Sequence, residues 1–294
     1  MRKILIPLFI FLGLLSIGFG VWFLYARSSS TTSAFDGQRA YQDVIAQVDF
    51  GPRTVGSPAH AEAIAYIQKQ LENAHWKVQR QNTSWKGFPI ENIIAIRNNQ
   101  TPQIILGAHY DSRMIADQDP GPGPHAPVPG ANDGASGVAV LLELARTLPT
   151  DSVPISLVFI DNEDNGGIGG QDWIMGSRAY VASLTFRPRA VVILDMIGDA
   201  HLNIYIERNS DPALVATIWK QAADLGYQQQ FIPTPKYSME DDHTPFLEAG
   251  IPAVDIIDFD YPYWHTTEDT PDKVSVASLQ IVGNVMHAWL IAQK

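Results

Sequence analysis

The chain has 294 residues, 46% of them hydrophobic and 17% charged, with 20 Lys and Arg against 31 Asp and Glu. This composition predicts a folded protein with a large core and excludes disorder over most of the chain. The net charge of −11 argues against nucleic-acid binding through phosphate neutralisation. Because there is no cysteine, disulfides, thiolate metal sites and cysteine nucleophiles are excluded, and metal ligands must be His, Asp or Glu.

The N-terminal segment contains a long apolar run. Residues 4–25 carry no charge, and as a helix they would span about 33 Å, enough to cross a bilayer. Two basic residues precede the run and only Arg27 follows closely, so the rest of the chain is expected outside the cytoplasm. We therefore expect residues 1–27 to be a membrane anchor and residues 28–34 to be a polar linker. The alternative is a cleaved signal sequence and a secreted protein, because Thr32-Ser33-Ala34 resembles a small-residue cleavage site.

Residues 35–294 form one predicted domain in which helices and strands alternate. Apolar residues at helical spacing predict helices over residues 59–74, 137–148, 171–183, 212–225 and 276–292. Runs rich in β-branched residues predict strands over residues 92–97, 103–110, 155–161, 190–196 and 253–257. Buried strands between helices indicate a three-layer α/β/α sandwich around a mixed, mostly parallel central sheet.

Acidic and histidine side chains follow the predicted strand ends, where ligands collect in sheets of this kind. They are His109 and Asp111, Glu163 and Asp164, Asp195, and His265. A further acid, Asp133, lies in a glycine-rich loop at the start of a predicted helix. Taken singly, an acid at a strand end is an ordinary cap or a solvated group. Together these oxygen and imidazole donors favour a catalytic zinc site with an open position.

These motifs resemble the M28 zinc peptidase superfamily, from about Phe50 to the C-terminus. The matching residues are His109-x-Asp111, the Gly-x-x-Asp133-x-x-Ser-Gly loop, Glu163-Asp164, Asp195 and His265-Thr266-x-x-Asp269. The resemblance implies a zinc-exopeptidase-like fold. Two branches of the superfamily compete: the aminopeptidases, with two zinc ions, and the glutaminyl-peptide cyclotransferases (glutaminyl cyclases), with one.

Local motifs are similar to the cyclase branch. They are the QDWIMGSR run at residues 171–178, the DDHTPF run at residues 241–246 and Trp264 directly before His265. The chain also departs from that branch. Residues 166–170 replace a tryptophan that follows the acidic pair, so one wall of the pocket is expected to differ. Asp255 stands where animal cyclases have a histidine, which changes the outer hydrogen-bond network, and the second acid of the pair is Asp164 rather than Glu.

The resemblance implies an acyltransferase that converts the N-terminal Gln of a peptide to pyroglutamate and releases ammonia. One Zn²⁺ would be held by Asp133, Asp164 and His265. Glu163, beside a ligand, is the candidate proton shuttle, and Asp195 and Asp241 would hydrogen-bond the migrating proton and the tetrahedral intermediate. Trp264 and His243 are expected in the substrate pocket. The partners implied are a peptide or protein with a free N-terminus and, through the N-terminal helix, a membrane.

Two alternatives stay open. A dizinc aminopeptidase would place His109 and Asp195 on one metal, Asp164 and His265 on the other, and Asp133 between them. In the cyclase interpretation, His109 is unligated and Asp111 is an acceptor that orients a histidine. The second alternative is a non-catalytic, membrane-anchored binding ectodomain on the same fold, because a fold does not by itself imply activity.

Overall fold

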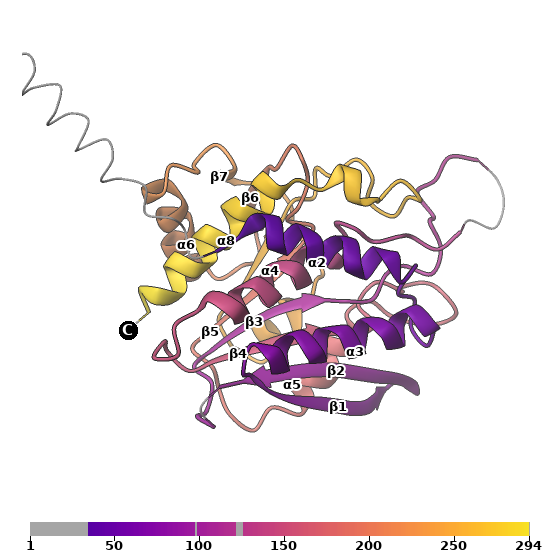
Figure 1. Ribbon diagram of the computed structural model, residues 1–294, viewed down its shortest axis with the longest axis horizontal. Coiled ribbons are helices and arrows are strands. Elements are labelled where there is room, and N and C mark those ends of the chain that lie inside the picture. The colour runs from indigo at the N-terminus through magenta and orange to yellow at the C-terminus, as the bar shows by residue number, and fades with distance from the viewer. Residues whose placement is uncertain (1–34, 98, 122–125, 294) are drawn as a thin grey trace, which may run out of the picture. The chain divides into compact units, whose positions relative to one another are not determined.

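The computed structural model describes residues 35–97, 99–121 and 126–293 (Figure 1). The predicted membrane anchor, residues 1–27, and the predicted linker, residues 28–34, lie outside this part of the chain. Among the described residues, no helix combines the length and the apolar character needed to cross a membrane.

The centre of the fold is a six-stranded mixed sheet with the strand order β1-β2-β4-β3-β5-β8. Its strands are β1 (Lys77–Trp85), β2 (Phe88–Ile96), β3 (Ile104–His109), β4 (Ile155–Ile160), β5 (Ala190–Asp195) and β8 (Ala253–Ile257). The pairs β1–β2 and β2–β4 are antiparallel, whereas β4, β3, β5 and β8 run parallel to one another. The carboxyl ends of these four parallel strands therefore meet along one edge of the sheet.

Helices cover both faces of the sheet (Figure 1). On one face pack α2 (Gly37–Asp49), α3 (Pro58–Asn73), α4 (Ala135–Thr147), α6 (Pro212–Asp224) and α8 (Val276–Ile291). The other face carries α5 (Met175–Ala182) and α7 (Thr244–Glu248). The remaining elements are a small parallel pair, β6 (Ile204–Ile206) and β7 (Phe231–Pro235), and a short 3₁₀ turn, η1 (Pro271–Lys273). The predicted α/β fold with a mixed central sheet is confirmed.

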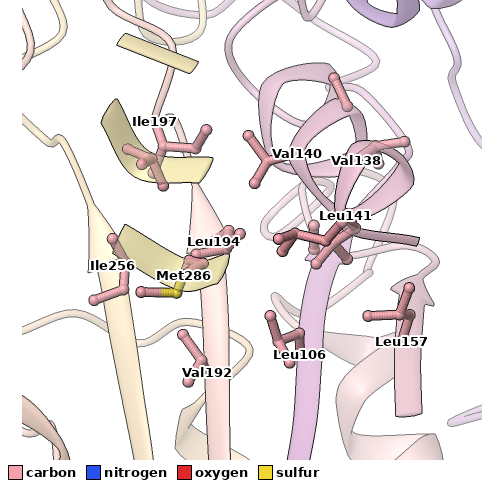
Figure 2. Packing of buried hydrophobic residues seen from close by; sticks show 14 of the residues in the cluster. Leu106, Val138, Val140, Leu141, Leu157, Val192, Leu194, Ile197, Ile256 and Met286 are labelled. Atoms are coloured by element: carbon pink, nitrogen blue, oxygen red, sulfur yellow. The ribbon is translucent and has the colours of Figure 1, made fainter. Parts of the chain in front are cut away.

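Alternate residues of the central strands build two separate cores. Leu106, Leu157 and Val192 face the larger core, where they pack with Leu141 of α4 and Met286 of α8 (Figure 2). Their chain neighbours face the opposite core, together with side chains of α5 and α7: Ile105, Val158, Ile193, Tyr180 and Phe246. Burying each large apolar side chain contributes about 1.5–3 kcal/mol, so the two cores hold the strand ends in fixed positions.

A glycine brings α4 close to the sheet. A Cβ atom on Gly137 would lie 2.2 Å from the backbone oxygen of Leu194, so only glycine permits this distance between helix and strand. The close approach places the loop before α4, which carries Asp133, beside the end of β5, which carries Asp195.

Candidate active site and metal centre

Three of the predicted metal ligands come together at the carboxyl edge of the sheet. Asp133 precedes α4, Asp164 follows β4 and His265 follows β8, and their donor atoms all lie within 4.8 Å of one another. Nε2 of His265 lies 2.9 Å from Oδ1 of Asp164 and 3.7 Å from Oδ2 of Asp133. All three side chains are buried. The fold thus converts three distant sequence positions into one donor cluster.

Asp133 is held by the buried carboxylate of Asp269. The backbone N–H groups of Asn132 and Asp133 donate to Asp269 over 2.9 and 3.1 Å. The hydroxyl of Tyr261 donates to the same carboxylate over 2.6 Å. These contacts explain why His265 and Asp269 occur in one motif. His265 is a donor of the cluster, and Asp269 holds the loop that carries Asp133, a second donor.

Asp111 holds the acidic pair. Its Oδ1 accepts from the backbone N–H of Glu163 at 3.1 Å, and its Oδ2 accepts from Asp164 N–H at 3.4 Å and from Asn165 Nδ2 at 3.2 Å. The same carboxylate lies 3.5 Å from Nδ1 of His109. Asp111 therefore lies beside the imidazole of His109 and fixes the backbone that carries Glu163 and Asp164.

His109 lies between two carboxylates. Its Nε2 is 3.1 Å from Oδ1 of Asp133 and 3.1 Å from Oδ1 of Asp195. Burial lowers the pKa of His109, but contacts with Asp111, Asp133 and Asp195 outweigh it and raise the pKa well above its usual range. Together, His109, Asp133 and Asp195 form a second donor set in which ligand atoms lie within 4.8 Å of one another. The structure therefore contains the side chains of both the one-zinc and the two-zinc arrangement.

Unsatisfied buried oxygens indicate that the first donor set suits a cation. Within the described part of the chain, Oδ2 of Asp133 and Oδ2 of Asp164 are buried and have no hydrogen-bond partner. Buried polar atoms almost always have a hydrogen-bond partner, so these two unpaired oxygens indicate a position for an ion or a water molecule. Two carboxylates and one imidazole are donors that zinc accepts, and three protein ligands leave a position open. These residues fit a catalytic zinc ion.

A cavity of about 220 Å³ opens onto the donor cluster. Its polar lining comprises Asp133, Glu163, Asp164, Asp195, Glu240, Asp241 and His265, and its apolar lining Trp173, Met196, Met239, Ile257, Phe259 and Trp264. The predicted catalytic acids and Trp264 thus share one small cavity. Burial raises the pKa of Glu163 well above its usual range and that of Asp195 to about 7, and neighbouring carboxylates such as Asp241 act in the same direction.

Trp173 supplies the second aromatic wall of this cavity. Its ring stacks on His265 with centroids 5.9 Å apart, and Trp264 stacks on the same imidazole at 3.7 Å. A Cβ atom on Gly166 would lie 2.1 Å from the Trp173 ring, so this glycine makes room for the indole. This wall of the cavity is therefore an indole, although no tryptophan lies directly after the acidic pair.

The structure places His243 outside the lining of this cavity, in which the sequence predicts it. Its side chain is fully buried, and it is absent from the lining that contains Trp264. Nε2 of His243 lies 3.2 Å from Oε2 of Glu207, and Nδ1 lies 3.8 Å from Oδ2 of Asp255. Although burial opposes it, the contact with His243 and backbone N–H donors lower the pKa of Glu207 to about 2. His243 and Glu207 thus form a buried pair outside the cavity lining.

Two arginines that the sequence did not single out lie close to the site. Arg53 is fully buried and donates to the backbone oxygens of Tyr110, Pro129 and Gly130 over 2.9, 2.9 and 2.6 Å. It joins the end of β3 to the loop of Asp133, and burial lowers its pKa to about 10. The second is Arg113, whose Nη1 donates to the backbone carbonyl of Asp164 over 2.8 Å. An isolated arginine carries no sequence motif, so neither was detectable before the fold.

Comparison with known proteins places this geometry in a family. The model of peptidase family M28 matches residues 92–290. A solved glutaminyl cyclase of Porphyromonas gingivalis is 33% identical, with a TM-score of 0.84 and coverage of 90% of this chain and 100% of that chain. A leucine aminopeptidase precursor of Bacteroides thetaiotaomicron is 32% identical, with a TM-score of 0.82 and coverage of 88% and 98%. The glutaminyl-peptide cyclotransferase of Drosophila melanogaster is 26% identical over 267 residues, covering 77% of this chain and 73% of its own. The chain belongs to peptidase family M28.

Proposed function

We propose that this chain is a zinc-dependent glutaminyl-peptide cyclotransferase. In this reaction the free α-amine of an N-terminal Gln attacks its own side-chain amide carbon. A ring C–N bond forms, the bond to the amide nitrogen breaks, and ammonia leaves. The observation that carries the proposal is the cavity of about 220 Å³, whose lining combines the donor cluster with Glu163, Trp173 and Trp264. The 33% identity to a glutaminyl cyclase supports it.

The proposed metal ligands are Asp133, Asp164 and His265. A zinc ion bound to them would supply a Lewis acid for the oxygen of the substrate amide, which is a poor electrophile on its own. The two unsatisfied oxygens, one on Asp133 and one on Asp164, support this assignment.

Glu163 is the proposed proton shuttle. Its carboxylate takes a proton from the attacking α-amine and delivers a proton to the leaving amide nitrogen, which contributes about 10²- to 10⁴-fold to the rate. Its backbone is fixed by Asp111 and by Ile174, whose N–H donates to the Glu163 carbonyl over 2.9 Å. Asp195 and Asp241 line the same cavity and would hydrogen-bond the migrating proton.

The aromatic walls protect the reaction from water. Hydrolysis of the amide to N-terminal Glu competes with ring closure, so a cyclase must exclude water from the amide carbon. Trp173, Trp264 and Phe259 are positioned in the lining to do so. The small cavity volume supports binding of one residue at a time.

A dizinc aminopeptidase is the second candidate. The donor set of His109, Asp133 and Asp195 favours it, because a second metal there would create a bridged pair. The resemblance to a leucine aminopeptidase precursor of Bacteroides thetaiotaomicron adds nothing to this, because a glutaminyl cyclase of the same organism matches with the same identity, TM-score and coverage. We favour one zinc, because a second ion would occupy Asp195, which the cyclase reaction needs as a hydrogen-bond partner. A non-catalytic binding ectodomain is the weakest candidate, since such a protein would be free to lose ligands and this chain retains all of them.

Residues 35–294 are proposed to be the catalytic domain, anchored outside the cytoplasm by residues 1–27 through the linker of residues 28–34. The support is the uncharged run of residues 4–25 and the basic residues before it. Protease added to intact cells or spheroplasts should digest the domain. Full protection would contradict the proposed orientation.

The enzyme reaction is tested with two peptides that differ only in their first residue, Gln or Leu. The purified full-length chain in detergent is incubated with each, and the products are identified by mass spectrometry. Loss of ammonia from the Gln peptide, with the Leu peptide intact, supports the cyclase. Release of free leucine supports the aminopeptidase, and no change in either peptide supports a binding protein.

A further inference from the structure

The segment of residues 113–119, which follows β3, lies against the turn that carries His265. The backbone N–H of Gln118 donates to the carbonyl of His265 over 3.2 Å. The carboxylate of Asp119 accepts from the backbone N–H and the hydroxyl of Thr267 over 3.0 and 2.7 Å. His265 itself has a left-handed backbone, with φ of 56°, a conformation that persists only where the surroundings hold it. The hydrogen bond from the backbone N–H of Gln118 to the His265 carbonyl supplies part of that support.

One carboxylate of this segment approaches the imidazole directly. Oδ1 of Asp117 lies 3.4 Å from Nδ1 of His265, on the side of the ring away from the donor cluster. The other nitrogen, Nε2, faces Asp164 and Asp133. A histidine that binds a metal through one nitrogen usually gives the N–H of the other to a carboxylate or carbonyl, which fixes the tautomer and the ring orientation. Asp117 has the position of such an acceptor.

The guanidinium of Arg113 holds the carboxylate of Asp117 in place. Its Nε and Nη2 donate to the two oxygens of Asp117 over 2.9 and 2.6 Å, a bidentate pair. Its Nη1 donates to the backbone carbonyl of Asp164 over 2.8 Å. Its guanidinium lies 4.7 Å from the centre of the Trp173 ring, which stacks on His265. One buried cation therefore contacts the acceptor of one proposed ligand, the backbone of a second, and a wall of the cavity.

We propose that Asp117 and Arg113 are positioning residues for the metal ligand His265. Asp117 accepts the Nδ1 proton, so that Nε2 is left as the unprotonated donor, and Arg113 holds Asp117 in the orientation that this requires. The inference rests on the proposed function only in taking His265 as a ligand. Arginine is needed because its planar fork reaches Asp117 with two donors and Asp164 with a third, which lysine cannot reproduce.

The test measures zinc affinity rather than catalysis. Purified full-length variants are stripped of metal, and their dissociation constants for zinc are determined by competition with a chromophoric chelator. Asp117→Asn should weaken zinc binding about 10- to 100-fold, the usual loss when a metal-bound histidine loses its outer partner. Asp119→Asn is the matched control, because Asp119 lies in the same segment but contacts Thr267 rather than the imidazole. Its zinc affinity should stay within about threefold of the parent chain, well short of the loss expected at an outer partner.

A purely structural role gives a different pattern. Asparagine keeps one acceptor oxygen for the buried Arg113 but loses the charge of the pair, so the metal-free Asp117→Asn variant should melt somewhat below the parent chain. A lower melting temperature with an unchanged zinc affinity would overturn the proposal. Arg113→Lys should also weaken zinc binding, and cobalt(II) in place of zinc should show altered visible bands in the Asp117 variant but not in the Asp119 variant.

The outcomes also separate this inference from the proposed function. If the parent chain binds zinc and His265→Ala does not, the ligand assignment stands, and equal affinity in Asp117→Asn then overturns the positioning role alone. If His265→Ala binds zinc as tightly as the parent chain, the proposed metal site and the positioning role fall together. Cyclase activity does not enter either comparison.

Discussion

Glu163→Gln separates proton transfer from metal binding at the proposed site. The backbone of Glu163 is held by Asp111 and Ile174, and neither contact uses the carboxylate, so the substitution leaves them intact. Glutamine has nearly the same shape but cannot carry the proton between the two nitrogens. We expect kcat/KM to fall about 10²- to 10⁴-fold, or about 3–5 kcal/mol in the activation barrier, with a melting temperature close to that of the parent chain.

The assay combines two measurements on the same preparation. Ammonia released from a Gln-initiated peptide gives the rate, and elemental analysis gives zinc per chain. The expected result is a large loss of rate at unchanged zinc content. Asp164→Ala is the comparison, since removing a proposed ligand should lose zinc and activity together. Loss of zinc from Glu163→Gln would refute the reasoning and exchange the roles of the two neighbouring acids.

Three further changes test other parts of the account. His109→Ala should keep most of the zinc and much of the cyclase activity, because His109 is unligated in the one-zinc arrangement; loss of half of a two-zinc content would contradict this. Glu207→Gln should have a lower free energy of unfolding in urea than the parent chain at pH 7. This difference should shrink as the pH falls from about 4.5 toward about 2, because the pKa of Glu207 is lower in the folded than in the unfolded chain. A constant difference across that range would rule out the ionised contact with His243. Leu106→Ala, in the buried centre of β3, should cost about 2–5 kcal/mol in urea unfolding, against less than about 0.5 kcal/mol for Leu225→Ala on the surface.

The sequence predicts the central strands well because they are continuous apolar runs buried on both faces. The predicted strands at residues 253–257 and 190–196 match β8 and β5 closely. Strands and helices with a mixed or polar surface cannot be predicted from apolar runs. β1 is an edge strand made mostly of exposed polar residues, and it has no apolar pattern to detect. The buried side of α2 includes Asp43 and Gln47, so its apolar stripe is interrupted.

The position of the site can be predicted from the sequence because the carboxyl ends of parallel strands lie at one edge of the sheet. That rule, with the family resemblance, predicts that Asp133, Asp164 and His265 lie close together. It says nothing about which side chains turn inward after the strand ends. For that reason the sequence predicts His243 in the pocket, whereas in the structure it is buried against Glu207. Trp173 belongs to a motif that the sequence shows, but its place in the cavity wall depends on the path of residues 166–170, which the sequence does not predict.

A cyclase of this kind should hold one zinc ion per chain and leave Asp195 uncoordinated. The most direct measurement is the product formed from Gln- and Leu-initiated peptides by a preparation whose zinc content is known. The expected result is one zinc per chain, ammonia and pyroglutamate from the Gln peptide, and an intact Leu peptide. Two zinc ions per chain at full activity, together with release of N-terminal leucine, would contradict it.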